Sequence, residues 1–281
     1  MKRKILLPAC VSVLLVLTPA IASAQAVLQL DFGPTVATGD AALTNSPWHT
    51  VSNSTSDKTW NTVGWTDIAA GGLKWSDGTT AARISLSLGG NTASTKNIYL
   101  SGNSNYPGEA SRLSGALGTA TASGVYSGTS VATDGIYVGS SSGTRSVGFQ
   151  LAGLAAGTYD IYITARNTNL SGSQTQNLYV GTSSVASDNF NFTNYATESL
   201  TFSSNTVSTT AWVEAGKGEA ANYVKFTVTL SSGDILNIAS QSSVRGFLNS
   251  VQIVAVPEPA TVALLAGLGV LTTVIVFRRR S

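Results

Sequence analysis

The side chains that most often do chemistry in enzymes are scarce in this sequence. His49 is the only histidine, Cys10 is the only cysteine, and Asp and Glu together number 14 in 281 residues. A Ser-His-Asp hydrolase would have to use His49, but its neighbours Trp48 and Thr50 form no hydrolase pattern, and we expect no Gly-x-Ser-x-Gly elbow. No pair of acids lies in a recognisable glycosidase motif, although two carboxylates can also meet only in the folded chain. We therefore expect no catalytic residue, no cofactor and no transition-metal site.

Calcium is the one metal that the sequence leaves open. Outside EF-hands, its oxygen ligands from Asp, Asn and backbone carbonyls have no fixed spacing, so a calcium site need not leave a motif. Asp31, Asp160 and Asp234 are the candidates, and each falls in an expected strand or turn. Aspartates in turns commonly accept hydrogen bonds from nearby backbone N–H groups. We expect these three residues to have such structural roles.

Four of the five tryptophans fall in one polar and irregular stretch, residues 39–75. An exposed indole face can stack on a sugar ring, whereas a buried one fills a core or fixes a loop on a sheet. The spacing marks no flat platform, so the sequence favours the structural role and keeps the binding role as a hypothesis. The candidate carbohydrate-binding residues are Trp48, Trp60, Trp65 and Trp75.

The end of the chain has three consecutive parts. Pro257 and Pro259 hold the residue before each of them extended, so Glu258 is displayed on a short rigid spacer. Residues 260–277 carry no charge and would be about 27 Å long as a helix, close to the thickness of a bilayer's hydrocarbon core. The three arginines at 278–280 are of the kind that stays in the cytoplasm. The sequence therefore predicts a transmembrane helix with the rest of the protein outside the inner membrane.

This tripartite tail resembles the PEP-CTERM sorting signal of exported bacterial proteins. The resemblance implies processing by an exosortase, a membrane-embedded cysteine transpeptidase that would cut near the Pro-Glu-Pro motif. The protein would then be released or transferred to the cell surface. The alternative is a plain C-terminal anchor that is never cut. The residues of the expected signal are Pro257, Glu258, Pro259, Arg278, Arg279 and Arg280.

The start of the chain has the composition of a secretory signal peptide. Residues 2–4 are basic, residues 5–17 form an apolar run, and residues 22–24 are a small-x-small cleavage site. Cys10 leaves with this segment, so the mature chain has no thiol. Without the six basic residues near the two ends, ten of the 16 Lys and Arg remain against 14 acids, a net charge of about −4. This balance argues against nucleic acid as a partner.

The segment between these two ends has the periodicity of an all-β protein. Alternating apolar residues predict strands over 27–32 and 223–230, and residues 146–166 predict two antiparallel strands joined as a hairpin by a glycine-bounded turn. Residues 231–234 predict a second tight hairpin, to a strand over 235–239. No amphipathic helix of 11 residues occurs. About ten strands in all predict an antiparallel β-sandwich of jelly-roll type.

Residues 151–166 also resemble a Gly-Leu-x-x-Gly-Thr-Tyr segment of extracellular β-sandwich modules. That segment occurs in jelly-roll, galactose-binding-like and fibronectin-like domains. Residues 246–253 are similar to the closing strand of the same modules. Both resemblances imply a β-sandwich ectodomain.

We therefore expect a signal peptide over residues 1–24, a β-sandwich over 25–254 and the sorting signal over 255–281. The protein would cross the inner membrane through the general secretion machinery and be anchored transiently by the helix over 260–277. It would then remain at the cell surface or in the extracellular matrix. We favour a non-catalytic surface or extracellular-matrix protein and keep binding of extracellular polysaccharide as a hypothesis. The alternative is a secreted enzyme that acts on polysaccharide through an unrecognised carboxylate site.

Overall fold

The computed structural model places the described residues in one unit that extends over Gln25–Glu258. The expected signal peptide, the expected transmembrane helix and residues 258–281 lie outside the described part. Among the residues that are described, no helix has the length and apolarity to span a membrane. The described residues are 27–33, 46–52, 58–107, 111–114, 125, 134–139, 143–166, 173–202, 211–217 and 221–257.

The described residues form 15 strands and one short helix, where the sequence predicts about ten strands. Six of the strands have only three or four residues, too few for alternation to stand out in the sequence. The elements are β1 (Val27–Phe32), α1 (Pro47–Ser52), β2 (Asn61–Val63), β3 (Ser85–Asn91), β4 (Asn97–Leu100), β5 (Ser111–Ser114), β6 (Gly135–Val138), β7 (Arg145–Ala152), β8 (Gly157–Thr164), β9 (Gln174–Ser183), β10 (Asn189–Asn191), β11 (Ala196–Phe202), β12 (Val224–Leu230), β13 (Ile235–Ser242), β14 (Gly246–Leu248) and β15 (Ser250–Val256).

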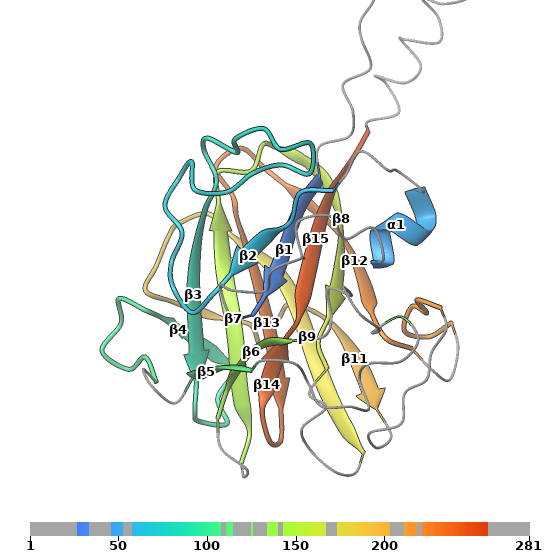
Figure 1. The fold of residues 1–281 in the computed structure, drawn as a ribbon. Helices are drawn as coiled ribbons and strands as arrows, with labels where there is room; N and C mark the ends of the chain where they lie inside the picture. Colours follow the sequence, from blue (N-terminus) through green and yellow to red (C-terminus); the bar gives the residue numbers. More distant parts are fainter. Residues whose placement is uncertain are drawn as a thin grey trace, which may run out of the picture. The chain divides into compact units, whose positions relative to one another are not determined.

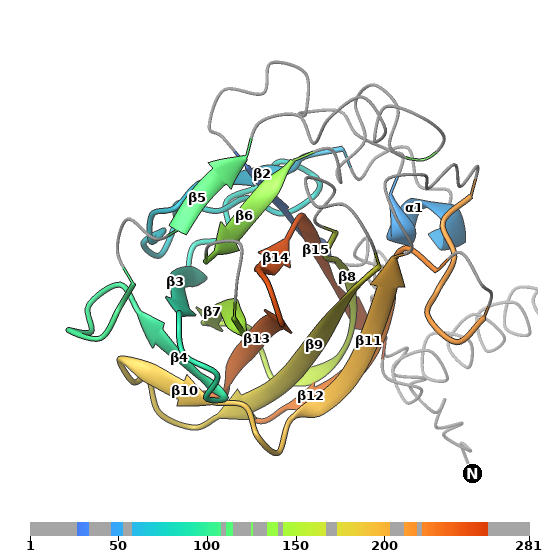
Figure 2. The same cartoon turned by 90° about the horizontal axis from the view of Figure 1, so that it is seen from below.

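Two curved sheets face each other as a sandwich (Figure 1), which confirms the expected all-β class. The five-stranded sheet has the order β12-β8-β15-β1-β2, and the seven-stranded sheet has the order β10-β4-β3-β7-β13-β9-β11. A small third sheet, β14-β6-β5, lies across one end, as the view from below shows (Figure 2). Among the strand pairs described, only β1 and β2 run parallel.

The core lies between the two large sheets and follows the period of two along each strand. On β1, Leu28, Leu30 and Phe32 point inward and are fully buried. The ring of Phe32 meets that of Phe149 from the opposite sheet, with centroids 5.4 Å apart. The outward residues of β1, including Gln29, are also buried, because helix α1 and the loop before β2 cover that face. This double covering explains why β1 is buried at every position.

The two predicted hairpins are wrong, although the strands themselves are confirmed. β7 pairs with β3 and β13 in the seven-stranded sheet, whereas β8 pairs with β12 and β15 in the five-stranded sheet. The same holds for β12 and β13, which also lie in different sheets. Since both edges of β7 and of β8 are occupied by other strands, the chain must cross between the sheets at 153–156. A second crossing is made by residues 231–234.

The first and last long strands of the sandwich are neighbours. β1 and β15 run antiparallel, and Val27 is the register partner of Val254. The beginning of β1 and the end of β15 therefore lie at the same end of the sandwich. Both crossing turns lie at that end too, because β8 begins there, opposite the last residues of β15. We call it the exit end.

Candidate functional site

A cavity of about 810 Å³ lies at the exit end. The crossing turn at 153–157 forms one wall, and Ser232 and Gly233 of the other crossing turn form a second. The loop at 81–84 and the last two residues of β15, Ala255 and Val256, complete the lining. The cavity thus exists because two tight turns pass from sheet to sheet side by side. The sequence alone gives no sign of it, since its walls come from five separate segments.

The chemistry of this lining is aromatic and aliphatic with one charged side chain. The aromatic lining residues are Trp75 and Tyr159, and the charged one is Arg83. The hydroxyl of the lining residue Thr158 pairs with that of Thr229 at 3.1 Å. None of the lining residues is an Asp or a Glu. Such a surface can stack on a flat ligand and donate hydrogen bonds, but the lining offers no pair of carboxylates for acid–base hydrolysis.

Trp75 is held in place by its own backbone. Its N–H donates to the carbonyl of Thr79 at 2.8 Å, and its carbonyl accepts from Gly78 at 2.9 Å, which closes a tight turn. The next residue, Ser76, donates its N–H to the carbonyl of Val27 at 2.8 Å. These bonds fix the turn to the start of β1. The Trp75 side chain is half-buried and packs against the main core, so the ring is positioned before any ligand arrives.

The crossing turns are rigid for local reasons. Gly153 and Gly233 have φ values of 89° and 87°, which side-chain-bearing residues rarely adopt. The hydroxyl of Tyr159 donates to the carbonyl of Ala155 at 2.9 Å. In the second turn, the carboxylate of Asp234 accepts the N–H of Ser231 at 2.8 Å. Asp234 is therefore a turn residue, as the sequence predicts.

The structure does not bring the four candidate tryptophans together. Trp75 lines the cavity, whereas Trp65 packs elsewhere against the core and stacks on Tyr106 at 6.1 Å between ring centroids. Trp48 and Trp60 belong to a second cluster, on the outer face of the five-stranded sheet. Of the four, only Trp75 is placed where a ligand could reach it in a described cavity. The sequence shows that these four residues are tryptophans, but it does not show which of them lines a cavity and which pack in a cluster.

His49 lies in a buried polar network beneath helix α1. Its Nδ1 contacts the hydroxyl of Ser46, which also accepts a hydrogen bond from Gln252 at 2.9 Å. Gln252 donates to Gln29 as well, and its carbonyl oxygen accepts the N–H of Trp48 at 2.9 Å. Ser46 is fully buried and His49 is 5% exposed. The Ser–His contact is thus closed to a substrate and serves to join α1 to β15.

A hydrolase-like serine motif falls in the connection between β6 and β7. Residues 139–143 do have the spacing Gly-x-Ser-x-Gly, although no such elbow is expected. In the α/β-hydrolases this spacing belongs to a turn from a strand into a helix. Here it connects β6 to β7, two strands in different sheets. The element that follows Gly143 is thus the strand β7, where the hydrolase turn leads into a helix.

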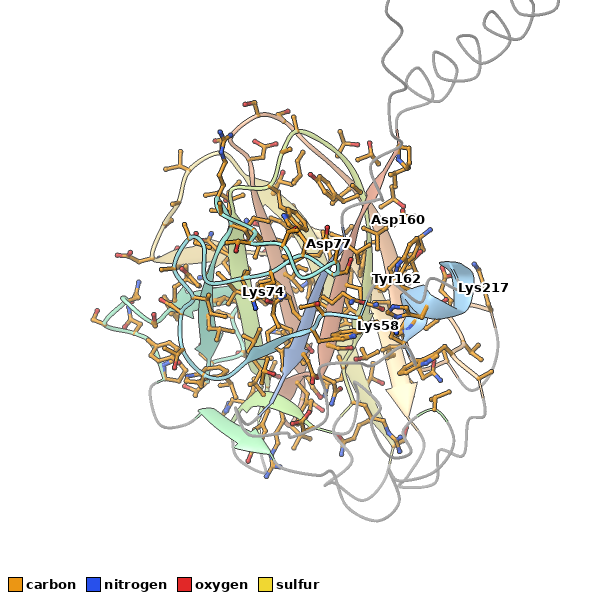
Figure 3. All side chains as sticks on the ribbon, turned by 45° about the horizontal axis from the view of Figure 1, so that its top comes forward. Lys58, Lys74, Asp77, Asp160, Tyr162 and Lys217 are labelled. Carbon is orange, nitrogen blue, oxygen red and sulfur yellow. The ribbon has the colours of Figure 1, made fainter. Side chains whose placement is uncertain are left out.

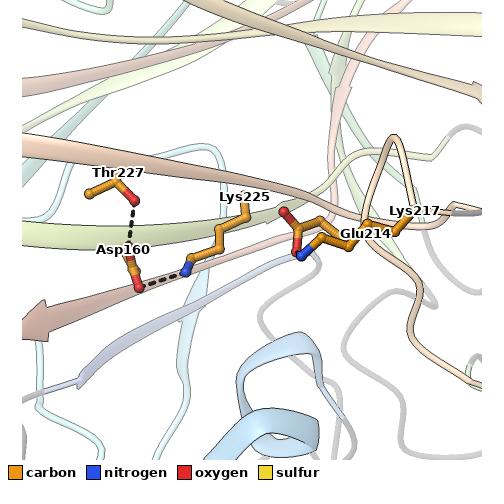
Figure 4. A network of polar contacts seen from close by, with 5 residues as sticks. All are labelled: Asp160, Glu214, Lys217, Lys225 and Thr227. Carbon is orange, nitrogen blue, oxygen red and sulfur yellow. Dashed lines mark hydrogen bonds and ion pairs between the residues drawn. The ribbon is translucent and has the colours of Figure 1, made fainter.

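Asp160 has surroundings unlike those of a metal site. Asp160 forms an ion pair with Lys225 at 2.8 Å and accepts a hydrogen bond from Thr227 at 2.7 Å (Figure 4). Asp31 is buried on β1. Within the described ranges, no group of three or more His, Cys, Asp or Glu could hold a metal ion.

Tyr162 has a strongly perturbed pKa. It lies on the same strand as Asp160, on the face that carries α1 (Figure 3), and its ring meets that of Trp48 at 6.0 Å. Burial, followed by the negative charges of Asp160 and Glu214, raises the pKa of Tyr162 from 10.0 to about 12. The tyrosine therefore stays neutral in the folded protein under conditions where the unfolded chain ionises.

This shift predicts alkaline destabilisation. Below pH 10 the phenol is neutral in both states, and the stabilisation is fully present. As the pH rises from about 10 to about 12, the unfolded state loses this proton first, so the free energy of unfolding falls. We expect Tyr162→Phe to flatten that fall. Denaturant titrations across this range should be paired with tyrosinate absorbance, and an equally steep fall in the variant would assign the effect to other groups.

One part of the chain matches a known sequence family. Residues 255–280 match the model described as the PEP-CTERM protein-sorting motif. This motif indicates a protein that is exported and sorted at the membrane, with a C-terminal anchor region. The match confirms the resemblance of the tail. No curated protein matches the sequence.

Solved structures resemble the chain only distantly. A family 35 carbohydrate-binding module from Clostridium thermocellum is 15% identical over 43% of this chain and 78% of its own, with a TM-score of 0.26. The module TmCBM61, in complex with β-1,4-galactotriose, is 12% identical over 53% of this chain and 80% of its own, with a TM-score of 0.23. Both similarities are too weak to bear on function.

Proposed function

We propose that this chain is a non-catalytic surface or matrix protein, a jelly-roll-like β-sandwich whose sorting tail is removed by an exosortase after export. The observation that carries the proposal is the sorting motif over 255–280. The structure adds that β15 runs to Val256, so the motif begins within the last strand. Pro257 is exposed directly after it. The peptidase would meet an extended segment that leaves a fixed point on the sandwich.

We propose further that the exit-end cavity binds a polysaccharide. Trp75 would supply a half-buried ring for stacking, and the exposed Arg83 would supply donors for sugar hydroxyls. The cavity volume, about 810 Å³, is within the range for small-ligand sites. A lining without carboxylates favours binding over hydrolysis. This observation supports the non-catalytic hypothesis over the alternative of a polysaccharide-acting enzyme.

Trp75→Ala is the direct test of the cavity. Removal of a stacking residue at the centre of a binding site costs about 2 kcal/mol, so glycan affinity should fall by roughly 30-fold. The measurement is a glycan array with the released, tail-free protein, followed by calorimetry on the best ligand.

The matched control is Trp65→Ala. It removes an equally large, half-buried ring that packs against the same core but does not line the cavity. Affinity should be unchanged in this control, while both variants lose stability. Equal affinity loss in the two variants would show that the cavity is not the binding site. The same protein should be assayed for hydrolysis, since turnover would contradict the non-catalytic proposal.

A further inference from the structure

The polar network beneath α1 holds a serine hydroxyl against a side-chain amide. Ser46 and His49 come from the segment around the start of α1, and Gln252 comes from β15. The Nε2 atom of Gln252 lies 2.9 Å from Oγ of Ser46, which also contacts Nδ1 of His49. The three residues are 0%, 5% and 1% exposed in the order Ser46, His49 and Gln252. A nucleophile, a base and an amide thus meet where bulk water is excluded.

The hydrogen bonds around Ser46 determine the direction of its hydroxyl proton. Gln252 donates an amide N–H to Oγ at 2.9 Å, so the hydroxyl accepts on that side and its own proton is left for another acceptor. Nδ1 of His49 is that acceptor when the neutral imidazole carries its proton on Nε2. In this arrangement a histidine can remove the proton of an attacking serine.

The amide of Gln252 is held and polarised by its neighbours. Its carbonyl oxygen accepts the backbone N–H of Trp48 at 2.9 Å, and a donor there stabilises the negative charge that attack places on this oxygen. Its second N–H donates to Oε1 of Gln29 at 2.8 Å. Because the amide C–N bond is about 1.33 Å long, the amide carbon is at most about 4.3 Å from Oγ of Ser46. A near-attack arrangement needs roughly 3–3.5 Å, which a turn about the Cγ–Cδ bond and a shift of about 1 Å supply.

From these contacts we infer that Ser46 and Gln252 join as an intramolecular ester, a covalent cross-link that the folded chain makes by itself. Oγ of Ser46 attacks the amide carbon of Gln252, and Nδ1 of His49 accepts the hydroxyl proton. The C–N bond of the amide then breaks, the same proton passes to the departing Nε2, and one molecule of ammonia is released. The product holds an Oγ–Cδ ester bond, and no oxidant or other reactant is consumed. Burial of the site protects the ester from hydrolysis.

The cross-link would act in this sandwich as a disulfide does in other exported proteins. Residues 25–258 contain no cysteine. The ester joins positions 206 residues apart and ties the α1 segment to β15, the middle strand of the five-stranded sheet. A covalent link of this kind constrains the unfolded chain, and more strongly when the loop is longer. It involves neither the exit-end cavity nor the sorting tail, so it does not depend on the proposed function.

Peptide mapping of the mature protein by mass spectrometry tests the cross-link. A digest at Lys and Arg should contain a branched peptide that joins the segment ending at Lys58 to the segment beginning at Gly246, lighter than their sum by one ammonia. Fragment spectra should place the link between Ser46 and Gln252, and hydroxylamine, which cleaves esters, should split the peptide. The mass of the whole protein does not decide, because an N-terminal Gln25 can also lose ammonia by cyclising.

Two variants and a control assign the chemistry. Ser46→Ala removes the nucleophile and should abolish the branched peptide. His49→Ala removes the base and should slow the formation of the link roughly 100-fold or more, measured as the linked fraction at fixed times after synthesis. Ser250→Ala is the matched control, because it removes another buried hydroxyl of β15, one that pairs with Thr164 at 2.6 Å. The control should form the link at the wild-type rate.

Absence of the branched peptide from the folded wild-type protein would overturn the inference, whatever the variants do. Its presence in Ser46→Ala would overturn the inference too, since another group would then be the nucleophile. An unchanged rate in His49→Ala would overturn the role of the histidine as base. Circular dichroism shows whether each variant is folded. If Ser46→Ala fails to fold, the fragment spectra of the wild-type peptide still decide which two residues are joined.

Discussion

Replacing Glu258 with Gln should leave export intact and stop removal of the C-terminal tail. Glu258 is the only charged residue between the last strand and the arginines of the tail. A peptidase that recognises the motif has one carboxylate to read, held between two prolines. A hydrogen bond to a charged group contributes about 1.5–3 kcal/mol, so cleavage should slow by roughly 10- to 150-fold. Mass spectrometry of the C-terminus in the native host measures the outcome.

The control for this variant is Glu198→Gln. Glu198 is an exposed carboxylate on β11, within the sandwich and outside the matched motif. This change removes the same charge from the exported domain and should leave processing at the wild-type rate. Normal trimming of the Glu258→Gln chain would instead show that the carboxylate is not read. A tail that stays attached in the wild-type protein would make the segment a permanent anchor.

Gly153→Ala should be among the most destabilising single changes in the sandwich. Gly153 begins the crossing between β7 and β8 with a φ of 89°. A Cβ added there would lie 1.9 Å from the carbonyl oxygen of Arg83, a backbone atom that cannot rotate away. The left-handed conformation costs about 1–2 kcal/mol for a side-chain-bearing residue, and the clash adds to it. We expect a loss of roughly 3–5 kcal/mol in the free energy of unfolding.

Gly233→Ala separates the cost of the left-handed conformation from the cost of the steric clash. Its φ is 87°, but nothing lies within 4 Å of the added Cβ. This variant should therefore lose only about 1–2 kcal/mol. Denaturant unfolding of the tail-free protein gives both values. Similar losses in the two variants would mean that conformation alone, and not the contact with Arg83, determines the cost.

The sequence predicted individual strands well because each carries its own alternation. Residues 27–32 coincide with β1, and the alternation of 223–230 gave β12 to within one residue. The partners of these strands were not predictable in the same way. A four-residue glycine-bounded connection can close a hairpin or cross between sheets. The choice depends on which distant strands occupy the edges, as β12 and β15 do on either side of β8.

The sorting motif and the cavity differ in the same way: one is contiguous in the sequence, and the other is formed by residues far apart in it. The sorting motif is contiguous, so residues 255–280 could be recognised from the sequence. The cavity is not contiguous, and its walls become neighbours only through the two crossings. The sequence shows the positions of the tryptophans but not their surroundings. Trp75 lines the cavity, while Trp60 is buried within the cluster on the outer face of the five-stranded sheet.

The pairing of β1 with β15 also determines when, during export, the five-stranded sheet can be completed. The bond between Gln252 and Gln29 joins residues 223 positions apart, and β15 stands in the middle of its sheet. The five-stranded sheet cannot be completed until almost the whole exported segment has emerged. Contacts of such sequence separation form slowly. In the proposed export the chain would thus stay open during its passage across the membrane, and the sheet would close as the sorting tail arrives.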